Sequence, residues 1–309
     1  MATWKTLECI GAPHCRHECG FAELDGTFYL FGGRRVQPVD IFDPKTKTWR
    51  HGSPPPIEVH HFQPVVVGAE IWMLGTMKGL FPRETPLDTI LIYAPSSDTW
   101  KTGPEIPPER RRGACGCAMH SDGWIYVVGG IVDGHYSGTQ AWFDRINPAT
   151  GEWQILPDAP NKRDHAPCAI VGNTLYFFGG RESGRHNGQD FEAMPSHTIG
   201  AVDLYDFATG TWSVHPEPLP IETAAGGTGV VNAKIHYVGG ESGRLEAFNE
   251  MQIFDTISGV WSLGPPLNRA RHATNCCVYD GKLWIAAGSG ARGGAPELTS
   301  IECLDIDGA

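Results

Sequence analysis

Three histidines occupy matching positions in this sequence. His17, His60 and His272 line up with one another when the chain is aligned on the short turn that follows each of them. Imidazole nitrogens are ligands for Zn, Fe and Mn, and three that converge could hold one ion. The pattern predicts a divalent-metal cofactor at these histidines. Hydrogen-bonding, proton-transfer or purely structural roles are the alternatives.

A second group of residues could move protons. His135 and Tyr136 are adjacent in a Gly-containing segment, His165 lies one residue beyond the aligned histidine position, and Glu241 directly follows a Gly-Gly pair. Imidazole and carboxylate groups are frequent general acids and bases. We therefore predict that these four residues are catalytic. An internal ion pair between Glu241 and a loop arginine is an equally good explanation for that glutamate.

Arginine is unevenly distributed along the chain. Arginines, but few lysines, follow the Gly-Gly pairs or precede the next apolar run, although the net charge is −11. Guanidinium makes paired, planar hydrogen bonds to carboxylate or phosphate, which ammonium cannot do. The predicted contacts to a small anionic or sugar-like ligand are Arg16, Arg34, His61, Arg112, Arg181, Arg244 and Arg271. The alternative is that arginines near strand starts join neighbouring parts of the fold.

The elements that would position these residues are repeated. An apolar run ending in Gly-Gly is followed by a tryptophan, as in 28–33 before Trp49 and 124–130 before Trp153, and further copies of the run start at Ile71, Leu175, Ile235 and Leu283. The last copy lacks a following tryptophan, and Trp4 supplies a matching one. Short β-rich runs separated by Asp-Gly and Gly-Gly turns predict an all-β protein built from similar units.

This pattern resembles the kelch repeat and covers essentially the whole chain. Kelch repeats form four-stranded blades, so the resemblance implies a six-bladed kelch β-propeller that is one domain over residues 1–309. Residues 1–10 would complete the blade of residues 271–306, closing the ring and removing an open sheet edge. Stretches such as 110–113 are also similar to galactose-oxidase-like kelch proteins of environmental microbes.

The candidate residues should lie on one face of this ring. In an antiparallel blade the connections alternate between two faces. One face receives short turns such as that at Asp25, whereas the other receives segments as different in length as 34–38 and 181–200. Loops that vary on a rigid scaffold often carry function. The arginine and histidine candidates fall on this variable face, which predicts a funnel there.

Two functions fit such a funnel. It could bind a small anionic or sugar-like molecule, with isomerase, epimerase or lyase chemistry as one option, because the segment 239–244 is partly similar to a loop of the sialic acid mutarotases, which are kelch enzymes. Alternatively, the protein is an interaction module that binds an acidic peptide. Galactose oxidase activity is not expected, because that copper site needs two tyrosines and two histidines near a cysteine, on a seven-bladed ring.

The composition excludes several other classes. An acidic chain with a pI near 5.6 argues against a nucleic-acid partner, and the lack of an apolar run of about 18 residues argues against a membrane span. Nine cysteines, mostly in apolar runs, predict buried free thiols rather than disulfides. The sequence starts without a secretory signal. It predicts a cytoplasmic protein, or a secreted one if the chain is a mature form.

Overall fold

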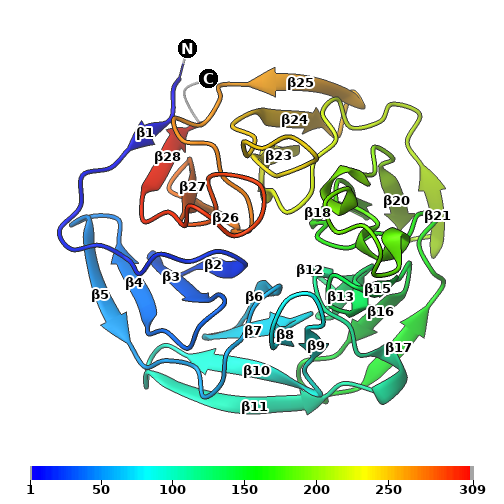
Figure 1. Ribbon diagram of the computed structural model, residues 1–309, viewed down its shortest axis with the longest axis horizontal. Helices are drawn as coiled ribbons and strands as arrows, with labels where there is room; N and C mark the ends of the chain where they lie inside the picture. Colours follow the sequence, from blue (N-terminus) through cyan, green and yellow to red (C-terminus); the bar gives the residue numbers. More distant parts are fainter. Residues whose placement is uncertain (1, 307–309) are drawn as a thin grey trace.

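Six sheets stand around a central axis in the computed structural model, which describes residues 2–306. Each sheet has four antiparallel strands, and two short ribbons of two strands lie in the loops (Figure 1). Each repeat of the sequence corresponds to one of these sheets, or blades. The predicted fold class, an all-β propeller of six blades, is confirmed.

The blades follow one another in chain order, and the strands of each blade are named from the axis outward. The first three blades contain β2 (Cys19–Leu24), β3 (Thr27–Gly32), β4 (Val39–Asp43), β5 (Thr48–Gly52); β6 (Gln63–Val67), β7 (Glu70–Leu74), β10 (Thr89–Ala94), β11 (Thr99–Glu105); β12 (Gly116–Met119), β13 (Ile125–Val128), β16 (Phe143–Ile146), β17 (Trp153–Leu156). The other three contain β18 (Cys168–Val171), β19 (Thr174–Phe177), β20 (Asp203–Asp206), β21 (Thr211–Val214); β22 (Gly227–Val231), β23 (Lys234–Val238), β24 (Met251–Asp255), β25 (Val260–Gly264); β26 (Cys276–Tyr279), β27 (Lys282–Ala286), β28 (Ile301–Asp305), β1 (Lys5–Thr6).

The loops carry the remaining regular structure. It comprises the ribbon strands β8 (Met77–Lys78), β9 (Thr85–Pro86), β14 (Ile131–Asp133) and β15 (Ser137–Thr139), and the 3₁₀ turns η1 (Pro108–Arg110), η2 (Ser183–His186) and η3 (Met194–Ser196). None of the helical turns in residues 2–306 has the length and apolar character needed to cross a membrane.

Aromatic side chains pack the blades against one another. The Phe28 ring of β3 lies 5.0 Å from the Trp284 ring of β27, and Trp49 of β5 lies 4.7 Å from Phe42 of β4. All four side chains are buried in one apolar cluster between the first and last blades. Because each buried aromatic removes a large apolar area from water, the tryptophan repeats act mainly as packing residues.

The Gly-Gly pairs end strands where a side chain would not fit. Gly32 has a φ of +72°, and a Cβ atom there would collide with the Phe62 ring and with the carbonyl of Val59 in the next blade. Gly33 has a φ of +97°. Glycine tolerates this backbone conformation without steric cost. The Gly-Gly pair at the end of β3, the second strand from the axis, thus lets the next blade approach closely.

The N-terminal strand closes the ring. In β1, Lys5 pairs with Cys303 and Thr6 with Glu302 of β28, so that β1 forms the outer edge of the last blade (Figure 1). The buried Trp4 ring donates a hydrogen bond from Nε1 to the carbonyl of Pro265, at 3.0 Å. The closure expected from the lone tryptophan at the start of the chain is confirmed.

Six residues just before the innermost strands surround the axis. Each has a left-handed backbone, with φ between +53° and +57°. Five donate their backbone N–H to the carbonyl of the previous member at 2.7–3.1 Å, and Cys19 closes the circle by donating to Ala273 at 3.3 Å. This axial ring consists of Glu18, His61, Ala114, His165, Ala225 and Ala273. Because this conformation is uncommon for residues other than glycine, the circle of hydrogen bonds must hold it in place.

Candidate functional site

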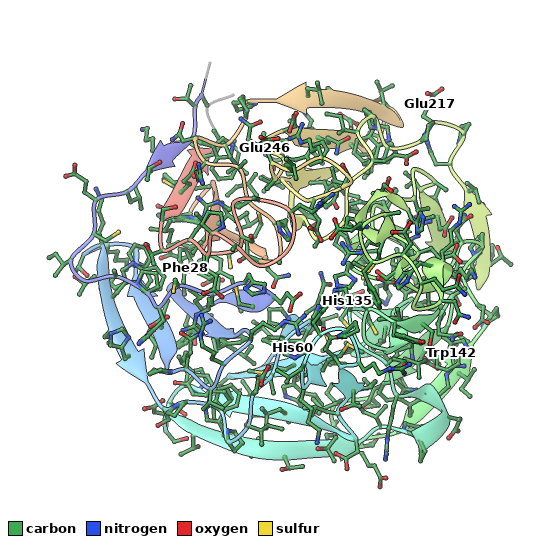
Figure 2. All side chains as sticks on the ribbon, in the orientation of Figure 1. Phe28, His60, His135, Trp142, Glu217 and Glu246 are labelled. Atoms are coloured by element: carbon green, nitrogen blue, oxygen red, sulfur yellow. The ribbon has the colours of Figure 1, made fainter. Side chains whose placement is uncertain are left out.

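Four side chains meet at the axis on the loop side of the propeller, and we call this group the axial cluster. Glu18, His61 and His165 come from the axial ring, whereas His135 comes from the ribbon of β14 and β15 in the third blade. One potential ligand atom from each lies within 4.8 Å of the others. Figure 2 shows His135 close to the centre of the ring of blades.

The three imidazoles contact one another. The ring centroids of His61 and His135 are 4.9 Å apart, those of His61 and His165 are 4.9 Å apart, and those of His135 and His165 are 5.0 Å apart. The side chains of His61 and His165 are 1% and 6% exposed. His61 and His165, which are far apart in the sequence, therefore form one compact, buried group with His135 of the ribbon.

Neighbouring carboxylates orient two of these rings. Nδ1 of His165 lies 2.6 Å from Oδ1 of Asp164, and Nδ1 of His135 lies 3.0 Å from Oε1 of Glu84. A carboxylate can only accept a hydrogen bond, so the proton of each neutral imidazole is on Nδ1. The lone pair of each ring is consequently on Nε2, where it is free to accept a proton or to bind a ligand.

The third imidazole has different partners. Nδ1 of His61 lies 2.6 Å from Nδ1 of His60, and its Nε2 lies 2.8 Å from Oε1 of Glu18. Arg34, which follows the first Gly-Gly pair, forms ion pairs with Glu18 and, at 2.7 Å, with Glu84. Among the arginines predicted to bind a ligand, Arg34 is the one shown in contact with Glu18 of the axial cluster.

The protonation states in the cluster follow from burial and charge. Burial lowers the pKa of His165 to about 4 and holds the pKa of His61 well below its usual value. Burial alone would raise the pKa of Glu18, but His61 and Arg34 outweigh it and hold that pKa well below the usual value. At neutral pH the carboxylate of Glu18 therefore lies beside the neutral imidazoles of His61 and His165, and the Nε2 lone pair of His165 is available.

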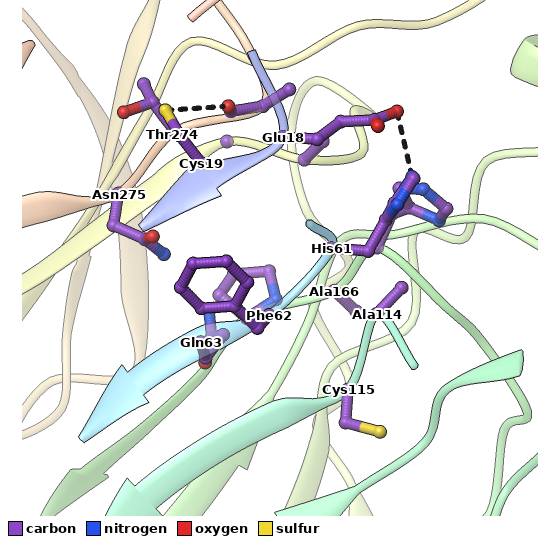
Figure 3. A pocket seen from close by; sticks show the side chains of 15 residues that line it. Glu18, Cys19, His61, Phe62, Gln63, Ala114, Cys115, Ala166, Thr274 and Asn275 are labelled. Atoms are coloured by element: carbon purple, nitrogen blue, oxygen red, sulfur yellow. Dashed lines mark hydrogen bonds and ion pairs between the residues drawn. The ribbon is translucent and has the colours of Figure 1, made fainter. Parts of the chain in front are cut away.

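A cavity of about 70 Å³ adjoins the cluster (Figure 3). Glu18, His61 and His165 line it at one end, and residues from the starts of the inner strands line the rest. One water needs only about 10–15 Å³, so there is space for several water-sized groups. Nε2 of His165 is buried without a hydrogen-bond partner among the described residues. This orphaned nitrogen is a group that a bound molecule could satisfy.

The structure does not bring the three aligned histidines together. Nδ1 of His17 lies 2.7 Å from Glu297, and Nε2 of His272 lies 2.9 Å from the carbonyl of Gly293. Nε2 of His60 lies 3.1 Å from the carbonyl of Gly79. His60 and His272 thus have partners in loops of their own blades, and His17 has its partner in the loop of the last blade. The left-handed residue one position later in the axial ring, rather than the aligned position, faces the axis.

Three of the arginines predicted to bind a ligand link strands within their own blades. Arg16, Arg112 and Arg271 are buried inside their own blades. Arg16 donates to Asp40 at 2.5 Å, Arg271 donates to Glu302 at 2.6 Å, and Arg112 pairs with Asp144 at 2.7 Å. They also donate to backbone carbonyls near the strand ends. A buried guanidinium needs such partners, and the structure shows these three side chains in contacts within the protein.

The other predicted residues lie outside the axial cluster. Arg181 is buried and forms an ion pair with Glu241, which also accepts a hydrogen bond from the Gly293 backbone at 3.0 Å. The guanidinium of Arg244 covers the Phe248 ring and pairs with Glu250 at 3.2 Å. Tyr136 lies beneath Arg83, 3.4 Å from guanidinium carbon to ring centroid. For Glu241 and Arg181, the structure shows the internal ion pair.

Sequence reasoning left three carboxylates out of the site. Glu18 occupies the same position of the repeat as His61 and His165, so an alignment shifted by one residue would have identified it. Asp164 occupies, in the fourth blade, the position aligned with His17, His60 and His272, so the repeat alignment does point to it. Glu84 comes from an irregular loop with no repeated pattern, and nothing in the sequence pointed to it.

Comparisons with known proteins agree with this architecture. A family model described as the KLHDC2/KLHL20/DRC7 Kelch-repeats domain matches residues 102–288. Kelch-like protein terF of Aspergillus terreus is 27% identical over 92% of this chain and 64% of its own length. Kelch-like protein 23 of Homo sapiens is 24% identical over 91% of this chain and 47% of its own length. The chain thus spans from about half to just under two thirds of the length of these relatives.

A solved structure has the same fold. The structure titled "Structure of YjhT" superposes with a TM-score of 0.76, at 16% sequence identity, over 94% of this chain and 95% of that one. At this identity the likeness concerns the fold alone. The family match covers more than half of the chain, and the repeats, the six blades and the Gly-Gly strand ends agree with it. This chain belongs to the KLHDC2/KLHL20/DRC7 family of Kelch-repeat domains.

Proposed function

We propose that the axial cluster binds a small polar molecule whose polar end enters the adjoining cavity. The observation that carries this proposal is the orphaned Nε2 of His165, buried beside the ionised Glu18 and open space. An unsatisfied buried polar atom costs free energy, and a bound hydroxyl would remove that cost. These groups are better suited to bind a ligand than to pack the protein interior.

The charge of the site favours a sugar-like ligand over an anion. The carboxylates of Glu18, Glu84 and Asp164 surround the imidazoles, and Arg34 is already paired with two of them. Arg16, Arg112, Arg181 and Arg271 are buried with partners inside the protein, and the exposed Arg244 is paired with Glu250. Hydroxyl groups can donate to carboxylates and to imidazole lone pairs. A neutral polyhydroxyl molecule thus matches the available acceptors.

The same groups could transfer a proton. A neutral imidazole accepts a proton through Nε2, and a carboxylate within hydrogen-bond reach of Nδ1 stabilises the imidazolium that forms. His165 with Asp164 and His135 with Glu84 are two such pairs. Proton-transfer isomerases and epimerases remove one proton from the substrate and return one to it, whereas a lyase that works by β-elimination removes one proton and delivers one to the leaving group as its bond to carbon breaks. We include this chemistry in the proposal for His165 and His135.

A protein-interaction module is the second candidate. Leu80 and Phe81, in the loop between β8 and β9, are 81% and 52% exposed, and Leu245, in a loop of the fifth blade, is 67% exposed. Exposed apolar side chains on a loop face suit a peptide partner. Because most loop-face arginines are internally paired, such a peptide would be held by apolar contacts more than by the acidic residues first expected.

The test compares how substitutions in the axial cluster and at the loop rim change ligand binding. Calorimetric titration of neutral sugars and the corresponding sugar acids into the wild-type protein should give binding that His165→Ala and Glu18→Gln weaken at least tenfold. The exposed outer-strand variant His51→Ala and the rim variant Leu80→Ser should bind as the wild type does. Binding that only Leu80→Ser weakens would assign the ligand to the loop rim and contradict the proposal.

A further inference from the structure

The axial cluster contains the donor set of a transition-metal site. Three imidazole nitrogens and one carboxylate oxygen can each be chosen so that all lie within 4.8 Å of one another. Around a four-coordinate ion with bonds of about 2.1 Å, donors are separated by roughly 3.4 Å. A bound ion would draw the donors closer together than they now lie. Imidazole and carboxylate together suit Zn²⁺, Fe²⁺ and Mn²⁺.

The residues behind these donors have the arrangement of a supported metal site. Asp164 and Glu84 accept the Nδ1 protons of His165 and His135, which leaves Nε2 as the coordinating nitrogen. Asp164 is itself fixed, because it accepts hydrogen bonds from Thr139 Oγ1 at 2.7 Å and from the Ser183 backbone at 3.0 Å. Carboxylates that orient ligating histidines in this way are typical of metal sites.

One donor lacks any partner, which points to a missing ligand. The side chain of His165 is 6% exposed, and its Nε2 has no hydrogen-bond partner among the described residues. The cavity beside it is lined by Glu18 and His61 as well. A metal ion at this position would satisfy Nε2 of His165 and give Glu18 a second positive partner.

The local charge also favours a cation. Glu18, Glu84 and Asp164 carry three negative charges close to the imidazoles, and the guanidinium of Arg34 is the positive group paired with two of these carboxylates. Arg34 competes with an ion for Glu18, but its contact with Glu84 at 2.7 Å can remain when Glu18 turns to a metal. The backbone ring that holds Glu18, His61 and His165 provides the rigidity that a metal site needs.

We propose that His61, His135 and His165, together with Glu18, bind one divalent transition-metal ion at the mouth of the cavity. This set differs from the aligned histidines, which have separate partners. These four donors would fill a four-coordinate ion, so a further ligand on the cavity side would make the ion five-coordinate, an expansion that catalytic zinc sites undergo in some transition states. Coordination would occupy the imidazole lone pairs. A sugar-like molecule would then bind through an oxygen on the ion rather than through a hydrogen bond to imidazole.

The test measures the ion itself. Protein freed of metal with a chelator is incubated with Zn²⁺, Mn²⁺ or, without oxygen, Fe²⁺; unbound ion is removed, and metal per chain is measured by mass spectrometry. Wild-type protein should hold close to one ion and gain several degrees in melting temperature. His135→Ala is the main variant, because this residue lies in a loop ribbon outside the blades and its loss should leave the fold intact. That variant and Glu18→Gln should lose at least 90% of the ion.

The control is His51→Ala, because His14, Asp40 and His51 form a second group of possible ligands at the outer edge of the first blade. This variant should keep the full ion content. Three results would each overturn the proposal. They are wild-type protein that takes up no ion, His135→Ala protein that takes up a full complement of ion, and His51→Ala protein that loses the ion. Ligand binding is measured separately in metal-free and metal-loaded protein, so sugar binding by a protein that takes up no ion would refute the metal site and leave the proposed function standing.

Discussion

At the scale of single residues, burial decides which side chains are available for chemistry. Six of the nine cysteines are buried, and burial raises the pKa of Cys115 to about 11 and the pKa of Cys276 to about 12. Cys15 is exposed. Since the thiolate is the reactive form, the folded protein should show one rapidly labelled thiol. Ellman's reagent should detect it in the wild type but not in Cys15→Ser; a fast phase that persists in that variant would contradict this.

The buried arginines are expected to matter for stability rather than for binding. Removing one partner of a buried ion pair costs about 3–5 kcal/mol, whereas an exposed pair contributes about 0–1 kcal/mol. Arg271 and Glu302 are both fully buried, whereas the side chain of Arg35 is 51% exposed. Urea unfolding should therefore show a large loss of stability for Arg271→Ala and a small one for Arg35→Ala. Equal losses would mean that Arg271 is not a structural link.

At the scale of elements, the ion pair between Arg181 and Glu241 joins the loops of the fourth and fifth blades. Burial would raise the pKa of Glu241, but His272 and Arg181 outweigh it and lower the pKa from 4.5 to about 2. A lowered folded-state pKa stabilises the protein above the unfolded value, and this contribution is lost as the pH falls from about 4.5 towards 2.

This linkage gives a pH-dependent prediction. Glu241→Gln should lower the free energy of unfolding by about 3–5 kcal/mol at pH 7, because it leaves the Arg181 charge buried without its partner. The difference between wild type and variant should shrink when unfolding is measured at pH 3 instead. A difference that is independent of pH would show that Glu241 is not ionised in the folded protein.

The elements could be predicted from the sequence because their signals repeat. Gly-Gly pairs recur in four of the six units and a tryptophan recurs in each blade, with Trp4 serving the last one. Both have structural causes, close approach of the next blade and packing between blades. The axial cluster could not be predicted, because it depends on which of two adjacent residues faces the axis. That choice is made by the left-handed backbone at Glu18, His61 and His165, which no local sequence pattern indicates.

The internal partners of the buried arginines could not be predicted for a related reason. The acidic partners of Arg16, Arg112 and Arg271 are on the third strand of each blade, at sequence separations that change with the length of the intervening loop. A constant spacing would have revealed these pairs. Without one, an arginine that links strands within a blade and an arginine that binds a ligand look alike in the sequence.

At the scale of the whole molecule, one short strand keeps the ring closed. Loss of β1 would expose the backbone edge of β28 and remove the buried Trp4 side chain. Deletion of a large buried aromatic side chain costs about 3–5 kcal/mol, and an open strand edge invites aggregation. A variant without its first ten residues should melt at a lower temperature and scatter light on warming. If it stays soluble with the wild-type melting temperature, β1 does not close the ring.

The closed ring also explains why the axial cluster can stay assembled. The circle of backbone hydrogen bonds draws one residue from every blade to the axis, so the position of Glu18 depends on all six blades. Both the proposed ligand site and the proposed metal site rest on one claim, that the carboxylates of Asp164 and Glu84 bind the Nδ1 side of His165 and His135 and leave Nε2 of these rings for a ligand.

The ¹⁵N NMR spectrum of the histidine rings tests this claim most directly. In metal-free protein at pH 7, His165 should give the nitrogen shifts of neutral imidazole with the proton on Nδ1, because Asp164 accepts that proton and burial lowers the pKa of this ring to about 4. Nδ1 of His135 should also carry a proton, which Glu84 accepts. Assignment by the His165→Gln and His135→Gln variants identifies the two rings. Imidazolium shifts of His165, or the proton on its Nε2, would contradict the account, since no lone pair would then face the cavity.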